Sequence, residues 1–240
     1  MLTLAIDSSQ DICTLAIGRG TSVVAEYHFA HKMNLLRRLL PNIDSILSDN
    51  ELTTSDIDAI IFGSGPGSFT GLRIGGTTAK SLAYVLGKPI VAVGTLDAMA
   101  YGATTAEDSL ICPMIFARVD EVYWGLFEAG GNRLTDYAVS SISDVLDDLV
   151  NRKKRVHFCG TGARRNWETI AAKLAESATL APQWNDYTRG AALIDLGLKR
   201  LDAGDVEDAM TLSPIYVRKP MAKTLSEQNN RGGVSGTPPR

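Results

Sequence analysis

The sequence predicts an α/β protein of two related lobes, and three observations support this. Predicted elements in the first 105 residues follow the order strand–strand–strand–helix–strand–helix, and the later residues repeat that order in reduced form. The 240 residues are enough for two lobes, each with a hydrophobic core. Hydrophobic residues make up 45% and charged residues 21% of the chain, as in ordinary soluble proteins.

Three apolar runs near the N-terminus predict strands over residues 2–8, 12–18 and 23–29. The turns between them are short, so neighbouring strands are expected to be antiparallel. A helix is predicted over residues 33–48, where apolar side chains recur at helical spacing. Pro41 is expected to kink this helix, because it has no N–H and crowds the preceding turn.

The first predicted lobe, residues 1–105, is completed by a strand over 58–62, a glycine-rich loop, a helix that ends near Leu86 and a strand over 89–93. The second predicted lobe covers residues 106–218. Its strands are predicted over 110–119, 122–128, 134–140 and 156–159, and its helices over 143–151, 165–177 and 189–203. The polar, basic tail over residues 219–240 is predicted to be disordered.

Charge and cysteine content limit the classes of function. The formal net charge of −3 argues against a protein whose main role is to coat nucleic acid. The three cysteines lie in apolar runs and form no Cys-x-x-Cys pair, which predicts buried, reduced thiols. The N-terminus lacks the features of a signal peptide, and no apolar stretch approaches the ~18 residues that span a membrane. A cytoplasmic protein without membrane contact is expected.

Two turns are candidates for an anion or nucleotide contact. Asp7 and Ser8 end the first strand, and Gly65, Gly67 and Ser68 precede the second helix. Glycines there allow close backbone approach, and a helix N-terminus offers free N–H groups. At both places an ordinary turn, which Asp, Ser and Gly favour, is the preferred explanation. The loop has neither the lysine of a P-loop nor the Gly-x-Gly-x-x-Gly spacing.

No pattern in the sequence predicts catalysis or a metal centre. The histidines and acidic residues form no cluster at ligand spacing, so no metal site is expected. Ser68 has no recognisable general base, and there is no Gly-x-Ser-x-Gly elbow. No catalytic residue is therefore assigned.

The second predicted helix carries a strip of small residues. Gly71, Gly75, Ala79 and Ala83 recur every four residues and so share one face. Glycine inside a helix costs about 1 kcal/mol relative to alanine, which indicates close approach of another backbone. That backbone is either the chain's own sheet or first helix, or a second subunit.

The strand and helix order resembles the actin-like ATPase (ASKHA, RNase H-like) fold of sugar kinases, with two βββαβα-type lobes of which the second is reduced. Individual segments resemble the TsaB (YeaZ) family more specifically, from Leu2 to about Arg218. The shared segments are Ala5-Ile6-Asp7-Ser8-Ser9, Leu39-Leu40-Pro41, Gly65-Pro66-Gly67-Ser68-Phe69-Thr70-Gly71-Leu72-Arg73, Thr95-Leu96, Ala117-Arg118, Glu121-Val122-Tyr123-Trp124, Gly160-x-Gly162-Ala163 and Pro214-x-Tyr216-x-Arg218.

This resemblance implies a non-catalytic subunit required to form N6-threonylcarbamoyladenosine at position 37 of tRNAs. It implies that the chain dimerises with TsaD and activates it, that the ATPase TsaE joins them, and that tRNA is contacted only indirectly. It implies no cofactor of the chain's own, with ATP or ADP at the TsaD–TsaB–TsaE complex. TsaD holds its metal with His-x-x-x-His after the strand that follows the glycine loop, and Thr95 and Met99 stand there in this sequence.

The resemblance also implies that the two helices of the first lobe dock TsaD, or a second copy of the chain in the absence of TsaD. Gly75→Leu is then expected to weaken the TsaD complex and to leave the isolated chain folded. The expected interface residues are Leu35, Leu36, Leu39, Arg73, Gly75, Thr77, Ala79, Lys80 and Ala83.

Two other functions remain open. The first is an actin-fold ATPase or small-molecule kinase that uses Asp7 and the glycine loop around ATP, which nucleotide turnover by the chain alone would favour. The second is a peptidase, against which the missing metal and nucleophile patterns argue.

Overall fold

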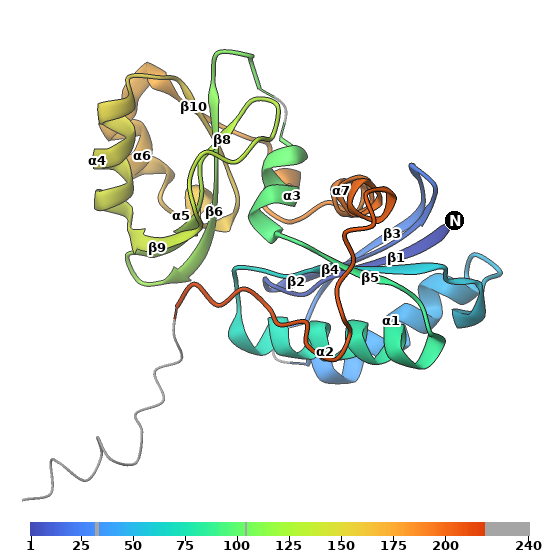
Figure 1. The fold of residues 1–240 in the computed structure, drawn as a ribbon. Helices are drawn as coiled ribbons and strands as arrows, with labels where there is room; N and C mark the ends of the chain where they lie inside the picture. The colour runs from blue at the N-terminus through green and yellow to red at the C-terminus, as the bar shows by residue number, and fades with distance from the viewer. Residues whose placement is uncertain (32–33, 104, 219–240) are drawn as a thin grey trace, which may run out of the picture.

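The computed structural model describes residues 1–31, 34–103 and 105–218, and it contains two α/β lobes (Figure 1). The predicted disorder of residues 219–240 concerns residues outside this description. Among the described residues, no helix is long and apolar enough to cross a membrane.

The sheet of the first lobe has the strand order β3-β2-β1-β4-β5. β1 (Leu2–Asp7), β2 (Ile12–Arg19) and β3 (Ser22–Ala30) are antiparallel neighbours, as predicted from the short turns between them. β4 (Ala59–Gly63) lies parallel to β1, and β5 (Ile90–Val93) lies parallel to β4.

The sheet of the second lobe repeats this arrangement. Its order is β11-β10-β6-β7-β9, so the first strand of the lobe is again central, with β7 and β9 on one side and β10 and β11 on the other, and β8 pairs with β6 outside this order. Its strands are β6 (Leu110–Arg118), β7 (Glu121–Trp124), β8 (Phe127–Glu128), β9 (Ala138–Ser141), β10 (Val156–Cys159) and β11 (Ala178–Leu180).

The strand predicted over residues 122–128 is interrupted. β7 ends at Trp124, β8 begins at Phe127, and both pair with β6. The helix predicted over 165–177 begins earlier and is broken at Asn166, whose side-chain amide donates to the carbonyl of Gly162. It forms α5 (Thr161–Arg165), α6 (Trp167–Leu174) and the 3₁₀ turn η2 (Ala175–Ser177).

Alternate residues of β1 pack on opposite faces of the first sheet. Leu4 and Ile6 share a core with α1 (Leu35–Ser48) and α2 (Phe69–Leu86), whereas Ala5 lies in a core with α7 (Gly190–Asp202). This alternation is the ordinary side-chain geometry of a strand. α7 follows the second lobe in sequence but covers the first sheet (Figure 1), which differs from its prediction as a helix of the second lobe. The boundary at residue 105 stays a prediction.

The remaining helices complete the two layers. α4 (Ile142–Arg152) and α6 cover the second sheet, and α3 (Thr95–Tyr101) lies between the lobes (Figure 1). Short 3₁₀ turns follow α1 and precede α7, as η1 (Thr54–Asp56) and η3 (Gln183–Asn185). α3 contributes Leu96 and Met99 to a core that includes Ile111 and Phe127 of the second lobe.

The strip of small residues on α2 faces the chain's own core. A Cβ added at Gly71 would overlap the carbonyl oxygen of Ser8, and one added at Gly75 would overlap the hydroxyl of Ser8. Ala79 and Ala83 are buried in the same core. The close approach predicted for this strip is therefore made by the β1–β2 turn of the same chain.

Glu26 of β3 holds the N-terminus of α7. Its Oε1 accepts from the Gly190 N–H at 2.7 Å and lies 2.7 Å from His28 Nε2, and its Oε2 accepts from Arg189 at 3.3 Å. Burial raises the pKa of Glu26, but the hydrogen bonds from His28 and Gly190 and the charge of Arg189 outweigh burial, and the net pKa lies below the ordinary 4.5.

Glu26→Gln is expected to lower the free energy of unfolding by about 1 kcal/mol at neutral pH, because the amide keeps the shape but loses the charge at the helix N-terminus. The carboxylate stabilises the fold above its unfolded-state pKa, and this contribution is lost as pH falls through its lower folded-state pKa. Urea unfolding at neutral and strongly acidic pH measures both values. An equal loss at both pH values, or the same effect from the exposed control Glu176→Gln, would contradict this assignment.

Candidate functional site

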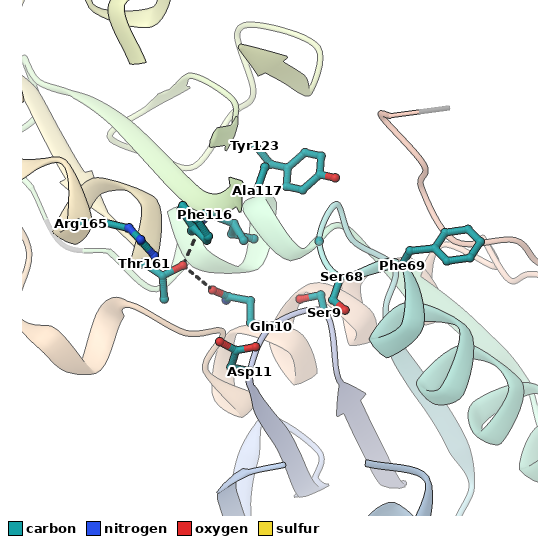
Figure 2. A pocket seen from close by; sticks show the side chains of 12 residues that line it. Ser9, Gln10, Asp11, Ser68, Phe69, Phe116, Ala117, Tyr123, Thr161 and Arg165 are labelled. Carbon is teal, nitrogen blue, oxygen red and sulfur yellow. Dashed lines mark hydrogen bonds between the residues drawn. The ribbon is translucent and has the colours of Figure 1, made fainter. Parts of the chain in front are cut away.

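A cavity of about 440 Å³ lies between the lobes, where the β1–β2 turn and the glycine loop of the first lobe face β6, β7 and α5 of the second (Figure 2). The glycine loop between β4 and α2 contributes Gly67 and Ser68 to its lining, and α5 contributes Thr161 and Arg165. Its walls are formed by Ser9, Gln10, Asp11, Gly67, Ser68, Phe69, Ile115, Phe116, Ala117, Tyr123, Thr161 and Arg165.

Asp7 does not line this cavity, because its carboxylate is used inside the protein. Its Oδ1 accepts from the Ser9 N–H at 2.8 Å. Its Oδ2 accepts from the hydroxyl of Thr95 at 3.0 Å and from that of Thr188 at 2.8 Å. The side chain packs against the backbone of Gly63. Asp7 therefore links β1 to α3 and to the segment before α7, which is a structural use of the carboxylate.

Of the other four residues predicted as an anion contact, two reach the cavity and two do not. Gly67 and Ser68 line it. Ser8 is buried and donates to the carbonyl of Gly71 at 2.8 Å. Gly65, at φ 101°, donates its N–H to the Thr95 hydroxyl at 3.1 Å. The turn interpretation accounts for Ser8 and Gly65, since their polar groups are satisfied within the chain.

The cavity still has groups that suit an anion. The hydroxyl of Ser9 is buried and has no hydrogen-bond partner among the described residues. It lies beside Ser68, the N-cap of the long helix α2, whose hydroxyl accepts from the Gly71 N–H at 3.2 Å. Arg165 adds positive charge on the other side, 4.1 Å above the ring of Phe116. Asp11 belongs to the same β1–β2 turn as Ser9, and its negative charge opposes the binding of an anion.

Gln10 joins the lobes at the inner end of the cavity. Its Oε1 accepts from the Thr161 hydroxyl at 3.3 Å (Figure 2), and its Nε2 donates to the sulfur of Met99 at 3.7 Å. Thr95 and Met99, which stand where the resemblance places the metal-binding histidines of TsaD, are both buried in these internal contacts. The Thr95 hydroxyl hydrogen-bonds to Asp7 and Gly65 within the first lobe, and Met99 packs in the core between the lobes.

The described residues contain no group of three His, Cys, Asp or Glu side chains that could hold a metal ion. Cys13, Cys112 and Cys159 are buried free thiols, as predicted. Burial is the main cause that raises the pKa of Cys159 to about 12. Thiolate chemistry at this position is therefore disfavoured.

The outward side of α1 and α2 is a second candidate site. Leu36 and Leu40 of α1 are 74% and 56% exposed, and Tyr84 and Val85 of α2 are 68% and 78% exposed. The two helices lie side by side on one face of the first sheet (Figure 1). We call these four side chains the apolar helix face. Large apolar groups exposed on adjacent helices are typical of a protein-binding surface.

The nine residues predicted for the interface fall into three groups: exposed, half-buried and buried. Three point outward on these helices: Leu36, Arg73 and Thr77. Lys80 is half-buried and donates to the carbonyls of Met210 and Leu212 at 3.1 and 2.7 Å. The other five are core residues, so their assignment to a partner surface is corrected: Leu35, Leu39, Gly75, Ala79 and Ala83.

Sequence reasoning missed three residues of the apolar helix face and two residues that make long-range hydrogen bonds near the cavity. Leu40, Tyr84 and Val85 were not assigned, although Leu40 and Tyr84 directly follow the buried residues Leu39 and Ala83, and Val85 is two positions beyond Ala83, which is a readable signal of exposure. Gln10 and Thr188 carried no such signal, because their partners lie far away in the sequence.

Comparison with known proteins supports one family. A family model described as "TsaD: tRNA N6-adenosine threonylcarbamoyltransferase" matches residues 29–223. The chain is 33% identical over 221 residues to the tRNA threonylcarbamoyladenosine biosynthesis protein TsaB of Bacillus subtilis (strain 168), which covers 91% of this chain and 94% of the relative. TsaB of Escherichia coli (strain K12) is 35% identical over 133 residues, 55% of this chain and 57% of the relative.

Solved structures show the same relationship. YeaZ from Pseudomonas aeruginosa has a TM-score of 0.69 and 26% identity, and the match covers 90% of this chain and 100% of that one. Component A of (R)-2-hydroxyglutaryl-CoA dehydratase from Acidaminococcus fermentans has a TM-score of 0.51 at 13% identity, over 84% of this chain and 99% of that one, which is a likeness of fold alone. With the repeated sheet order, these likenesses confirm the predicted actin-like fold.

The family model bears the name of the transferase, whereas a relative matched over nearly its full length is a TsaB, and a solved structure of 26% identity that the match covers completely is a YeaZ. The segments on which the sequence resembles TsaB are therefore part of a relationship that extends over most of the chain, and this chain belongs to the TsaB (YeaZ) family.

Proposed function

We propose that this chain is a non-catalytic subunit required for the formation of N6-threonylcarbamoyladenosine in tRNAs. Its part in tRNA threonylcarbamoyladenosine biosynthesis follows from its TsaB relatives. In this proposal the chain docks a TsaD-type partner through the apolar helix face and activates it. A TsaE-type ATPase joins the pair, any ATP or ADP binds at that assembly, and tRNA is reached through the partner.

The exposure of the apolar helix face carries the docking proposal. Leu36 and Leu40 are one helical turn apart on α1, and Tyr84 and Val85 occupy the last turns of α2. Covering such side chains removes apolar surface from water, which is the main driving force of association. A second copy of the chain presents the same helices, so a homodimer and the TsaD complex would compete for one surface.

Two observations on buried residues outside the cavity lining support a non-catalytic role. The Asp7 carboxylate, the group on which a kinase or ATPase function was based, already accepts three hydrogen bonds from the chain itself. Thr95 and Met99 are poor ligands for a hard metal ion and are buried between the lobes. The chain thus contributes a docking surface, and the partner contributes the reacting groups.

The experiment that tests this function is reconstitution of the modification from TsaD, TsaE, tRNA and a source of threonylcarbamoyl-AMP, with and without this chain. Modified adenosine, measured by mass spectrometry of digested tRNA, is expected only when the chain is present. Full modification without the chain would contradict the proposal.

The same preparation separates the alternative functions. The Ser9 hydroxyl, which has no hydrogen-bond partner within residues 1–31, 34–103 and 105–218, and the charge of Arg165 leave an anion-binding role for the cavity open to test. Steady ATP turnover by the isolated chain would favour the kinase or ATPase function, and cleavage of a peptide substrate would favour a peptidase. Neither activity is expected from the chain alone.

A further inference from the structure

The chain between α7 and residue 218 runs along the first lobe and then crosses to the second (Figure 1). Glu207 first pairs with Ile90 at the edge of β5. Lys80 of α2 then holds the segment through the carbonyls of Met210 and Leu212. Three separate contacts thus fix the path of this segment beside α2 before it reaches the cavity.

The segment next meets the first-lobe wall of the cavity. The Ile215 N–H donates to the carbonyl of Ser64 at 2.8 Å, at the start of the glycine loop. The ring of Tyr216 lies 5.1 Å from the ring of Phe69, at an interplanar angle of 44°. Phe69 lines the cavity, so Tyr216 supports one of its walls from outside.

Residue 218 then reaches the second-lobe wall. Arg218 forms an ion pair with Glu121 of β7, and Arg118 donates to the same carboxylate group at 2.7 Å. Tyr123, two residues along β7, lines the cavity (Figure 2). Within five residues the chain therefore contacts the glycine loop, Phe69 and the strand that carries Tyr123.

We propose that residues 214–218 are a clasp that holds the two lobes together at this edge of the cavity and restricts access to it. The lobes are also joined elsewhere, by Gln10 to Thr161 and by Tyr137 to Asp97. Those contacts keep the lobes attached when the clasp is released. Release therefore widens this edge of the cavity and does not separate the lobes. The clasp acts in the isolated chain and does not depend on the proposed partner.

A pair of truncations tests the clasp. A chain that ends at Ser213 loses residues 214–218, whereas its control ends at Arg218 and keeps every clasp contact. Spin labels on Ser81→Cys and Asn151→Cys, exposed on α2 and α4, report the distance between lobes by double electron–electron resonance. Compared with its control, the shorter chain is expected to show a broader distribution with a mean several ångströms longer. Identical distributions in two folded chains would overturn the proposal.

The rate at which a thiol reagent reaches the cavity is a second measurement that tests the clasp. Ser9→Cys places a thiol on the cavity wall, while burial raises the pKa of the native thiols and keeps them unreactive. A small thiol reagent is expected to label this cysteine about tenfold faster in the chain that ends at Ser213 than in the one that ends at Arg218. Tyr216→Ala in the full-length chain should accelerate labelling in the same direction. Equal rates in all three chains, with unchanged circular dichroism spectra, would also overturn the proposal.

Discussion

Leu36→Asp is expected to weaken the complex with a TsaD-type partner about 100-fold, which corresponds to about 2.8 kcal/mol. The side chain is exposed on α1, so the free chain tolerates a carboxylate there. In the complex the same carboxylate would be buried against an apolar surface without a counter-charge, which is costly. Isothermal titration calorimetry with purified TsaD measures the affinity. Tyr84→Asp on α2 is expected to act in the same direction.

Val150→Asp is the matched control for this prediction. Val150 is exposed near the end of α4, on the second lobe and away from the apolar helix face. The control should bind TsaD with unchanged affinity and support full tRNA modification. Equal binding by Leu36→Asp and Val150→Asp would show that the partner docks elsewhere. Loss of thermal stability in Leu36→Asp alone would show that the effect lies in the fold.

Gly75→Leu is expected to lower the free energy of unfolding of the isolated chain by about 2–6 kcal/mol, a result opposite to the unaffected fold that the sequence alone suggested. A Cβ at position 75 overlaps the Ser8 hydroxyl, and that hydroxyl donates to the carbonyl of Gly71. Overpacking a well-packed core costs typically about 1–3 kcal/mol, and a buried hydrogen bond is broken as well. Natural domains have only about 5–15 kcal/mol of stability in total. Urea denaturation followed by circular dichroism measures the effect.

Two control variants test whether the effect of Gly75→Leu comes from the overlap at position 75. They are Gly75→Ala, in the same place, and Thr77→Leu, on the exposed side of the helix. Alanine adds only the overlapping Cβ and gains about 1 kcal/mol of helix propensity, so a net destabilisation by Gly75→Ala isolates the steric effect. Thr77 is exposed on the same helix, so Thr77→Leu should leave the free energy of unfolding nearly unchanged. A folded, fully stable Gly75→Leu chain would contradict the packing described for α2.

Local patterns were enough to locate most helices and strands. The alternation and helical spacing of apolar residues identified β1 to β3, α2 and α7 to within a few residues, because these periods come from each element's own geometry. The broken helix α5–α6 was missed, since its break depends on the Asn166 side chain and its contact with Gly162.

The candidate sites were predicted less well, because each depends on contacts between distant residues. The strip of small residues on α2 was visible, but its neighbour, Ser8, lies 63 residues from the Gly71 that accepts its hydrogen bond. Asp7 was visible as a carboxylate at a strand end, but Thr188, whose hydroxyl donates a hydrogen bond to it, is 181 residues away in the sequence. The periodicity of a sequence shows that one face of a helix carries apolar or small residues. It does not show which part of the protein packs against that face.

The sequence by itself determined the α/β class, the repeated order of the lobes and the resemblance to the TsaB family, since these reside in local pattern and shared motifs. Only the tertiary structure decided which side of α2 is core and which is free, where α7 packs, and how residues 205–218 reach both lobes. Those features are set when the sheets assemble and bring distant segments together, and no local period encodes that assembly.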